Sequence, residues 1–345
     1  MDLLEELDQP RRLVDGLSRL DDVGALDGYQ DEMVSVVRRL LGDPDVDVLQ
    51  VTQVLAHLND TLTRRLLGLA ETEMGPPPCT YAWLSLGSHG RGEQVLSSDQ
   101  DSALAYEDGA DTAMEYFPVL AGHVVTALAR AGLPLCDGGY MATNWCRPIG
   151  EFRQMFHDWV ERPEPDALLR AEVFLDVRPV HGHLSVDVLD RALVSGGSRG
   201  PFRVQMARAA VTFRPPLSFF GRLRTPDSAL DVKRAGTAAI VLLARLYALV
   251  GGSSARTTVL RLQAAAEAAT MSRVGAAELA DSYRFLTGLR LRHQVEQAWH
   301  GREPDNLVPL EDLTADDRTH LRTTLRHLRD VQTVTASRFS THTVT

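Results

Sequence analysis

The chain contains few cysteine residues and few aromatic residues. Its 345 residues include only three cysteines, Cys79, Cys136 and Cys146, with no CxxC spacing. This argues against a disulfide framework or a zinc site and is typical of a reducing compartment. Aromatic residues make up only 6 % of the chain, but the hydrophobic fraction of 44 % is enough for an ordinary globular core.

Positive charge is also scarce. The net charge of −10 argues against non-specific nucleic-acid binding, which needs a basic surface. Lys233 is the single lysine among 36 basic residues. Because arginine fills the other basic positions, a retained lysine suggests a site that needs a compact ammonium group. The alternative is that Lys233 is a remnant with no special role.

Long apolar runs are missing as well. The longest, residues 238–244, ends at Arg245 and is too short to cross a bilayer. The first ten residues, MDLLEELDQP, are acidic and resemble neither a signal peptide nor a transit peptide. The sequence therefore predicts a cytoplasmic protein without a membrane partner.

Hydrophobic periodicity divides the chain into three parts. Residues 1–74 carry helical spacings, with predicted helices at Asp2–Leu20, Tyr29–Leu41 and Val48–Glu73. Gly75-Pro-Pro-Pro78 then breaks the pattern. Strand and helix patterns alternate over residues 75–195, with strands predicted at Tyr81–Leu86, Asp101–Tyr106, Leu133–Cys136 and Ala171–Val177, and helices at Thr112–Ala131 and Gly150–Arg162.

Residues 196–345 show no strand signal after Phe202. Five helices are predicted there: Phe202–Phe213, Ala229–Val250, Thr257–Thr270, Ala276–Trp299 and Leu313–Phe339. Short connections favour an antiparallel bundle. The predicted fold is α+β (mixed α/β), with a small sheet domain between an N-terminal helical segment and a C-terminal helical bundle.

The stretch from Leu86 to Tyr106, LGSHGRGEQVLSSDQDSALAY, carries the clearest chemical signal. Asp99 and Asp101 open a predicted strand, so their carboxylates point to the same face, roughly 6–7 Å apart along the chain. Two such carboxylates repel each other unless a cation lies between them. Magnesium is the usual cation held by one or two carboxylates together with substrate phosphates.

A Gly87-Ser88 turn precedes the aspartates, between a predicted strand and a helix predicted to start near Arg91. Backbone N–H groups at such a turn bind phosphate oxygens. Arg91 would contact phosphate, or would pair with Glu93 or an aspartate as scaffold. Together these residues predict a site for a metal ion and a nucleotide.

The motif of Gly87-Ser88, Arg91, Glu93 and Asp99-Gln-Asp101 resembles the nucleotidyltransferase superfamily of DNA polymerase beta and the kanamycin nucleotidyltransferases. It is closer to the DUF294 group of nucleotidyltransferases, related to the nucleotidyltransferase domain of the PII-protein uridylyltransferase GlnD. Four later segments also look like landmarks of this group: PLCDGGYMATNWCR, FLDVRPVHG, DVKRAG and LRLRHQVEQ. The resemblance covers most of the chain and makes residues 75–195 the expected nucleotidyltransferase domain and residues 196–345 the expected substrate-binding domain.

The resemblance implies two Mg²⁺ ions, or Mn²⁺, held by three carboxylates. Asp99 and Asp101 would supply two, and Asp176, on the predicted strand Ala171–Val177, would be the third and act near the attacking hydroxyl as a base. The alternative for Asp176 is an ion pair with Arg178 or Arg170.

The resemblance also places a basic residue of the helical domain on the triphosphate, which would be Lys233, with Arg234 as a substitute. The alternative is a solvated cation at a helix start. Further predicted contacts to nucleotide or acceptor are Glu93, Asn144, Arg147, Arg290 and His293. For Arg290 and His293 the alternative is a solvated helix end.

The resemblance predicts an enzyme that transfers a nucleoside monophosphate from ATP or UTP to a hydroxyl of a protein, with release of pyrophosphate. Two alternatives are a nucleotide sensor without catalysis and an aminoglycoside-type enzyme with a small-molecule acceptor.

Overall fold

The computed structural model describes residues 8–110, 112–164, 171–218, 223–224 and 228–341. The chain forms two compact units. Unit 1 comprises Met1–Phe156 and Glu172–Asp190, and unit 2 comprises His157–Ala171 and Arg191–Thr345. The predicted N-terminal helices and the sheet therefore belong to the same unit, although the Pro-rich breaker lies between them in sequence.

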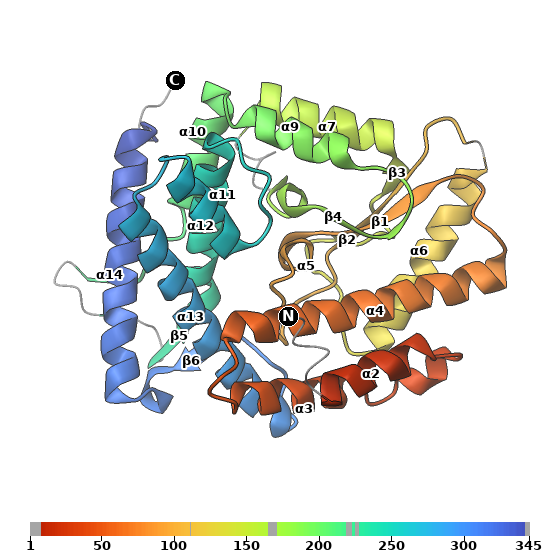
Figure 1. Ribbon diagram of the computed structural model, residues 1–345, viewed down its shortest axis with the longest axis horizontal. Helices are drawn as coiled ribbons and strands as arrows, with labels where there is room; N and C mark the ends of the chain where they lie inside the picture. The colour runs from red at the N-terminus through yellow and green to blue at the C-terminus, as the bar shows by residue number, and fades with distance from the viewer. Residues whose placement is uncertain (1–7, 111, 165–170, 219–222, 225–227, 342–345) are drawn as a thin grey trace. The chain divides into compact units, whose positions relative to one another are not determined.

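A four-stranded mixed sheet organises unit 1, in the order β3-β2-β1-β4 (Figure 1). The strands are β1 (Tyr81–Ser85), β2 (Ser102–Tyr106), β3 (Cys146–Pro148) and β4 (Arg178–Gly182). β1 pairs antiparallel with β2 and β4, and β2 pairs parallel with β3. Every residue of β1 and β2 is buried, as expected for strands with both faces covered.

Helices cover this sheet. Those of unit 1 include α2 (Asp8–Ser18), α3 (Tyr29–Leu41), α4 (Val48–Met74), α5 (Gly87–Arg91) and α6 (Ala113–Arg130), with the 3₁₀ helices η1 (Val23–Leu26) and η2 (Phe174–Asp176). α6 contacts β2 and β3, α4 contacts β4, and the two helices pack on each other. α4 begins with a capping box, in which the Asp47 side chain accepts from Leu49 N–H and the Gln50 side chain accepts from Asp47 N–H.

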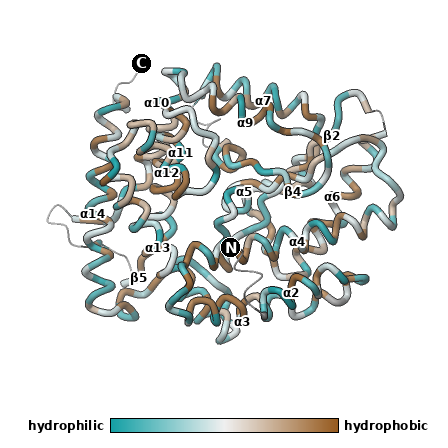
Figure 2. The backbone as a smooth tube through the Cα atoms, in the orientation of Figure 1, coloured by the Kyte–Doolittle hydropathy of each residue, from teal (hydrophilic) through white to brown (hydrophobic). Residues whose placement is uncertain are grey.

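Unit 2 is mainly helical. Its elements are α10 (Gly200–Ala210), α11 (Ala238–Val250), α12 (Thr258–Glu267), α13 (Arg273–Trp299) and α14 (Ala315–Arg338), with the π-helix η4 (Lys233–Thr237) and the 3₁₀ helix η5 (Leu310–Asp312). α7 (Ile149–Glu161) and α9 (Asp187–Gly196) span the boundaries between the units. α11 is buried along nearly its whole length, and its tube is largely brown in Figure 2. It forms the core against α10, α12 and α14.

The α+β class is confirmed, but three predicted elements are wrong. Residues 171–177 form no strand, because the strand starts only at Arg178 and η2 precedes it. Leu133–Cys136 contributes a single bridge, from Leu135 to Gln100, and the strand beside β2 is β3 instead.

The third error concerns Ala229–Val250, which is not one helix. β5 (Ala229–Asp231) pairs with β6 (Leu307–Pro309), so the bundle also contains a two-stranded ribbon. Strands of three residues are too short to show a period in sequence.

Candidate functional site

The Gly-Ser turn forms the N-terminal end of α5, directly after β1. Gly87 has φ +55, a left-handed conformation that favours glycine, and its N–H donates to Val173 O at 2.9 Å. The backbone of Leu86 donates to Asp101 O at 3.0 Å. These bonds place the turn beside the start of β2.

The side chain of Asp101 lies against the turn. A Cβ at Gly87 would be 2.8 Å from Asp101 Oδ2, so a larger residue would displace the carboxylate. Two features that the sequence placed 14 residues apart thus meet in space, and Gly87 has a steric role as well as a conformational one.

Asp99 and Asp101 flank a buried glutamine. Gln100 is 1 % exposed, and its amide donates to Leu133 O at 2.9 Å and to Val125 O at 3.3 Å. Both aspartates are partly exposed. In an extended chain, neighbouring side chains alternate, so the anchoring of Gln100 turns both aspartates to the other side. Nothing in the local sequence pattern indicates this role of Gln100.

The loop over residues 136–145 lies against the same strand. Ser102 N donates to Tyr140 O at 2.8 Å, and Cys136 is hydrogen-bonded to the Asp101 side chain. Burial raises the pKa of the Cys136 thiol, and the nearby Asp101 carboxylate raises it further. The thiol is therefore protonated at neutral pH and is a contact of Asp101 that the sequence did not reveal.

Two predicted contact residues of this region have local partners. Asn144 Nδ2 donates to Gly139 O at 3.0 Å, which closes the loop. Arg147 lies on β3, with Nη1 3.2 Å from Glu151 Oε2 and its guanidinium 5.1 Å from the centre of the Trp145 ring. Their predicted contact with a nucleotide remains a prediction.

Asp176 lies at the end of η2, and its side chain is completely buried. It forms an ion pair with Arg91, whose Nε also donates to Glu93 Oε2 at 2.7 Å. Asp176 thus forms an ion pair, as the alternative to metal binding expected, but the observed partner is Arg91. Arg178 pairs with Asp60 instead, and Arg170 lies outside the described residues.

The metal-binding role predicted for Asp99, Asp101 and Asp176 stays a prediction. Within the described residues, no group of three or more His, Cys, Asp or Glu side chains is arranged to hold a metal ion. The physical reason is that a fully buried carboxylate is stabilised by pairing, and Arg91 supplies that pair to Asp176. Asp99 and Asp101 remain as partly exposed oxygen donors beside the turn.

His89 lies on α5 and is buried. Burial, together with the positive charge of Arg178, lowers its pKa from 6.5 to about 3. The neutral ring is therefore the folded form. Because the unfolded chain binds the proton more tightly, stability is complete above pH 6.5 and falls as the pH decreases from 6.5 towards 3.

We expect His89 to account for a loss of about 2 kcal/mol in the free energy of unfolding between pH 6.5 and pH 4.5. Urea unfolding of the wild type and of His89→Asn at both pH values measures it. The variant is expected to lose less stability than the wild type over this interval. Equal losses in wild type and His89→Asn would contradict the buried neutral ring.

The predicted phosphate contacts of the helical domain lie in unit 2. Lys233 and Arg234 are exposed at the start of η4, directly after β5, and Asp231 Oδ1 accepts the Arg234 N–H at 2.9 Å. A Cβ at Gly236 would be 2.4 Å from Leu286 Cδ1, so α13 packs closely on η4. η4 is a π-helix that leads into α11, and π-helical turns of this kind are frequent at functional sites. A role of Lys233 on a triphosphate remains a prediction.

Arg290 and His293 hold the segment before β6 onto α13. Arg290 Nε donates to Asn306 Oδ1 at 2.8 Å, and His293 Nε2 lies 3.0 Å from Asp305 Oδ1. Both side chains thus have structural partners within unit 2, and they do not form the solvated helix end considered above. Their contact with a nucleotide or an acceptor stays a prediction.

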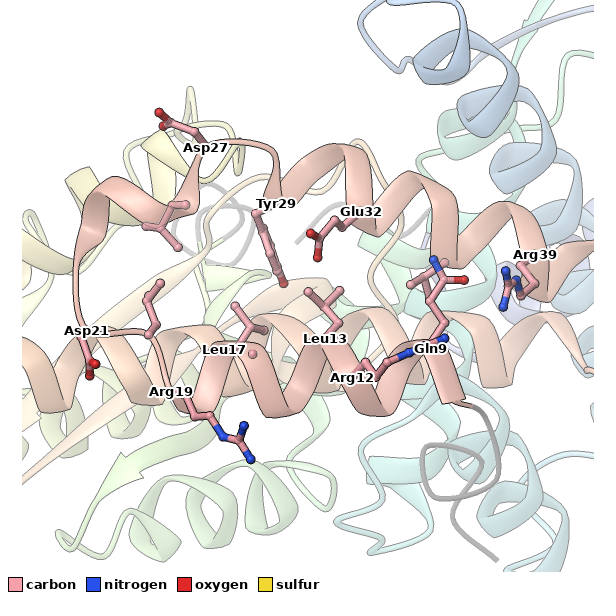
Figure 3. Close-up of a pocket in the computed structure, with 14 residues that line it drawn as sticks. Gln9, Arg12, Leu13, Leu17, Arg19, Asp21, Asp27, Tyr29, Glu32 and Arg39 are labelled. Atoms are coloured by element: carbon pink, nitrogen blue, oxygen red, sulfur yellow. The ribbon is translucent and has the colours of Figure 1, made fainter.

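Unit 1 also contains a cavity of about 710 Å³ between α2, η1 and α3. Figure 3 shows Tyr29, Leu13 and Leu17 between the two helices, with Gln9, Arg12 and Arg39 towards one end. Its lining includes none of the motif residues. The chemistry of the motif is therefore separate from this cavity.

None of the described helices combines the length and the hydropathy that crossing a bilayer requires.

Comparison with known families covers both units. Residues 32–166 match the family described as "Putative nucleotidyltransferase DUF294". Residues 200–339 match the "Putative nucleotidyltransferase substrate binding domain" that belongs with it. The search of curated proteins returned no significant match. The first match includes the turn of α5 and both aspartates, and the second includes η4 and its lysine. The chain therefore belongs to the DUF294 family of putative nucleotidyltransferases.

Proposed function

We propose that the protein is a Mg²⁺-dependent nucleotidyltransferase that moves a nucleoside monophosphate from an NTP to an acceptor hydroxyl and releases pyrophosphate. The observation that carries the proposal is the packing of the Asp101 carboxylate against Gly87 at the start of α5. It brings together a carboxylate, the kind of group that binds Mg²⁺, and a turn of the kind that binds phosphate.

Asp99 and Asp101 fit Mg²⁺, which prefers carboxylate oxygens together with the oxygens of a substrate's phosphates. Both side chains are partly exposed, so they can take a ligand without unfolding of the core. When bound, the metal would polarise the phosphoryl oxygens and neutralise developing charge. The backbone N–H groups at Ser88 and its neighbours would orient the triphosphate.

Asp176 would contribute through Arg91. Its buried carboxylate pairs with the arginine, and Glu93 holds the same guanidinium. The Arg91 side chain is only 11 % exposed. This low exposure favours a scaffold role for Arg91 over direct contact with phosphate. We therefore assign Asp176 to positioning Arg91, and the site to two metal-binding carboxylates.

The nucleotide and the acceptor follow from the resemblance. ATP or UTP is the proposed donor, and a protein hydroxyl is the proposed acceptor, with a small hydroxyl compound as the alternative. The net charge of −10 disfavours a nucleic acid. Lys233 of unit 2 is proposed to contact the triphosphate, because a compact ammonium suits a phosphate oxygen.

A second candidate is a nucleotide sensor without catalysis. It is favoured by the pairing of Asp176 with Arg91, because that pairing leaves the site without the third carboxylate expected in the superfamily. The two candidates share nucleotide binding and differ in turnover.

Incubation of the full chain with each labelled NTP and Mg²⁺, with pyrophosphate release and label incorporation as readouts, tests the proposal. Calorimetry of the same mixtures measures binding. Turnover with one NTP, lost on chelation of the metal, is expected. Mg²⁺-dependent binding without turnover on any protein or small hydroxyl acceptor supports the sensor, and the absence of binding for all four NTPs contradicts both.

A further inference from the structure

Arg178, at the start of β4, uses all three nitrogens of its guanidinium. Nη1 and Nη2 donate to the two carboxylate oxygens of Asp60 at 2.8 and 3.0 Å. Nη2 also donates to His89 O at 2.9 Å, and Nε donates to Gly90 O at 3.3 Å. One side chain thus joins α4, β4 and the last carbonyl groups of α5.

Asp60 is a charged residue on a face of α4 that is otherwise largely apolar and buried. Its side chain is 12 % exposed, and that of Arg178 is 22 % exposed. A two-armed pair of this kind is strong because both hydrogen bonds are charge-assisted and the fork of the arginine matches the carboxylate. Arg64, one turn further along α4, adds a weaker contact to Asp60 at 3.6 Å.

Arg64 forms a second polar contact between α4 and β4, in addition to the Asp60–Arg178 pair. Its Nε donates to Val180 O at 3.0 Å. The alignment of α4 with the sheet is therefore set by polar contacts of two side chains in addition to apolar packing.

The carbonyl groups that Arg178 binds belong to the helix that carries the Gly-Ser turn. A helix of five residues makes few internal hydrogen bonds, so contacts from outside determine where it lies. A Cβ at Gly90 would be only 1.6 Å from Asp176 O, so α5 also packs closely against the end of η2. Arg178 and η2 thus both hold α5 in place.

We infer that the Asp60–Arg178 pair is a positioning device for the proposed site, through which the N-terminal helix α4 sets the location of the Gly87-Ser88 turn. This inference rests on the proposed function. It gives α4 a role at the site, which its sequence does not indicate, and it makes Asp60 and Arg178 positioning residues and not catalytic ones. Loss of either partner should loosen the turn and weaken triphosphate binding while Asp99 and Asp101 stay in place.

The test compares Arg178→Gln, Asp60→Asn and the double variant with the wild type, all as full chains. Arg178→Lys keeps the charge but lacks the fork that reaches Asp60 and both carbonyl groups together. Asp27→Asn is the matched control, because Asp27 also accepts two hydrogen bonds from one arginine, Arg130, at 3.2 and 3.5 Å, but outside the motif.

Two readouts are needed, each at a temperature where circular dichroism shows the variant to be folded. The first is calorimetric binding of Mg²⁺ with inorganic tripolyphosphate and with each NTP. The second is amide hydrogen exchange over residues 86–93, where Gly90 N donates to Leu86 O at 3.0 Å and Glu93 N donates to Ser88 O at 2.9 Å.

We expect Arg178→Gln and Asp60→Asn each to raise the Kd by about tenfold or more, as is typical for residues that orient a binding group. The double variant should be no worse than the more damaging single one, because both remove the same pair. Exchange over residues 86–93 should be faster in all three, Arg178→Lys should resemble them, and Asp27→Asn should match the wild type.

A lower Tm with unchanged Kd and unchanged exchange over residues 86–93 would show a purely structural pair and overturn the inference, while the proposed function would stand. If the wild type binds neither tripolyphosphate nor any NTP, the proposed function fails. The exchange readout then still decides whether Arg178 holds α5.

Discussion

Replacement of Asp99 or Asp101 by asparagine is expected to reduce nucleotidyl transfer about a thousandfold or more. Asparagine keeps the size of the side chain but removes the negative charge that would hold the proposed cation. A bound metal contributes several kcal/mol to stabilising phosphoryl charge, and about 4 kcal/mol corresponds to three orders of magnitude in rate. Pyrophosphate release, measured with the NTP that the wild type uses, gives the effect directly.

The same substitutions should leave the fold intact. Both aspartates are partly exposed, and Gln100 between them supplies the buried hydrogen bonds. Thermal unfolding of both variants should therefore lie close to that of the wild type, with a small gain in stability if repulsion between the two carboxylates is relieved. Asp108→Asn, just beyond β2, is a suitable control for activity. Wild-type turnover in Asp99→Asn or Asp101→Asn would remove the metal pair from the proposal.

Removal of Arg91 is expected to have the largest effect on stability. Arg91→Met leaves the completely buried Asp176 carboxylate without its arginine. Breaking a buried pair from one side costs about 3–5 kcal/mol, because a charge stays in the interior. Chemical denaturation at pH 7 measures this as a lower free energy of unfolding.

The double variant Arg91→Met with Asp176→Asn should recover part of that loss, because neither charge of the pair remains. Asp21→Asn is the control. It breaks an arginine pair at 3.0 Å in which the aspartate is 92 % exposed, and it should cost less than about 1 kcal/mol. A cost for Arg91→Met no larger than for Asp21→Asn would contradict the buried pair.

The same series tests the role of Asp176. A third metal ligand would make Asp176→Asn inactive at nearly unchanged stability, since its loss would relieve repulsion among carboxylates. A positioning residue for Arg91 makes Asp176→Asn less stable, and Glu93 keeps part of the contact to the arginine. The two roles therefore differ in whether the free energy of unfolding of Asp176→Asn falls or stays close to that of the wild type.

Much of unit 1 could be predicted from local pattern. Strands at 81–85 and 102–106 follow from apolar runs bounded by turns, and the helices of the first 74 residues follow from their spacing. The Asp99-Gln-Asp101 motif could be recognised from sequence, because the alternation of side chains between the two faces of an extended chain is a local property. The family followed from these residues as well.

The contacts that position the motif could not be predicted in the same way. Arg178 is 118 residues from Asp60 in sequence, and Arg91 is 85 residues from Asp176. Each pairing depends on which helix covers which strand, and no local pattern carries that information. Arg91 was not among the partners considered for Asp176, because local reasoning could offer only the arginines next to it in sequence.

The ribbon of β5 and β6 shows a different limit. Three residues on each strand leave no measurable period. Lys233 follows β5 in a π-helix, whose residue spacing differs from that of an α-helix. The predicted helix Ala229–Val250 extended the strong signal of α11 too far towards the N-terminus.

The most direct test of the central proposal is a crystal structure of the full chain with Mn²⁺ and a non-hydrolysable NTP analogue. We expect an anomalous peak at about 2.0–2.2 Å from oxygens of Asp99 and Asp101, as in octahedral sites for ions of this size, with phosphate oxygens completing its shell beside Gly87 and Ser88. A manganese peak held by other side chains, with the triphosphate away from the α5 turn, would contradict the proposed site.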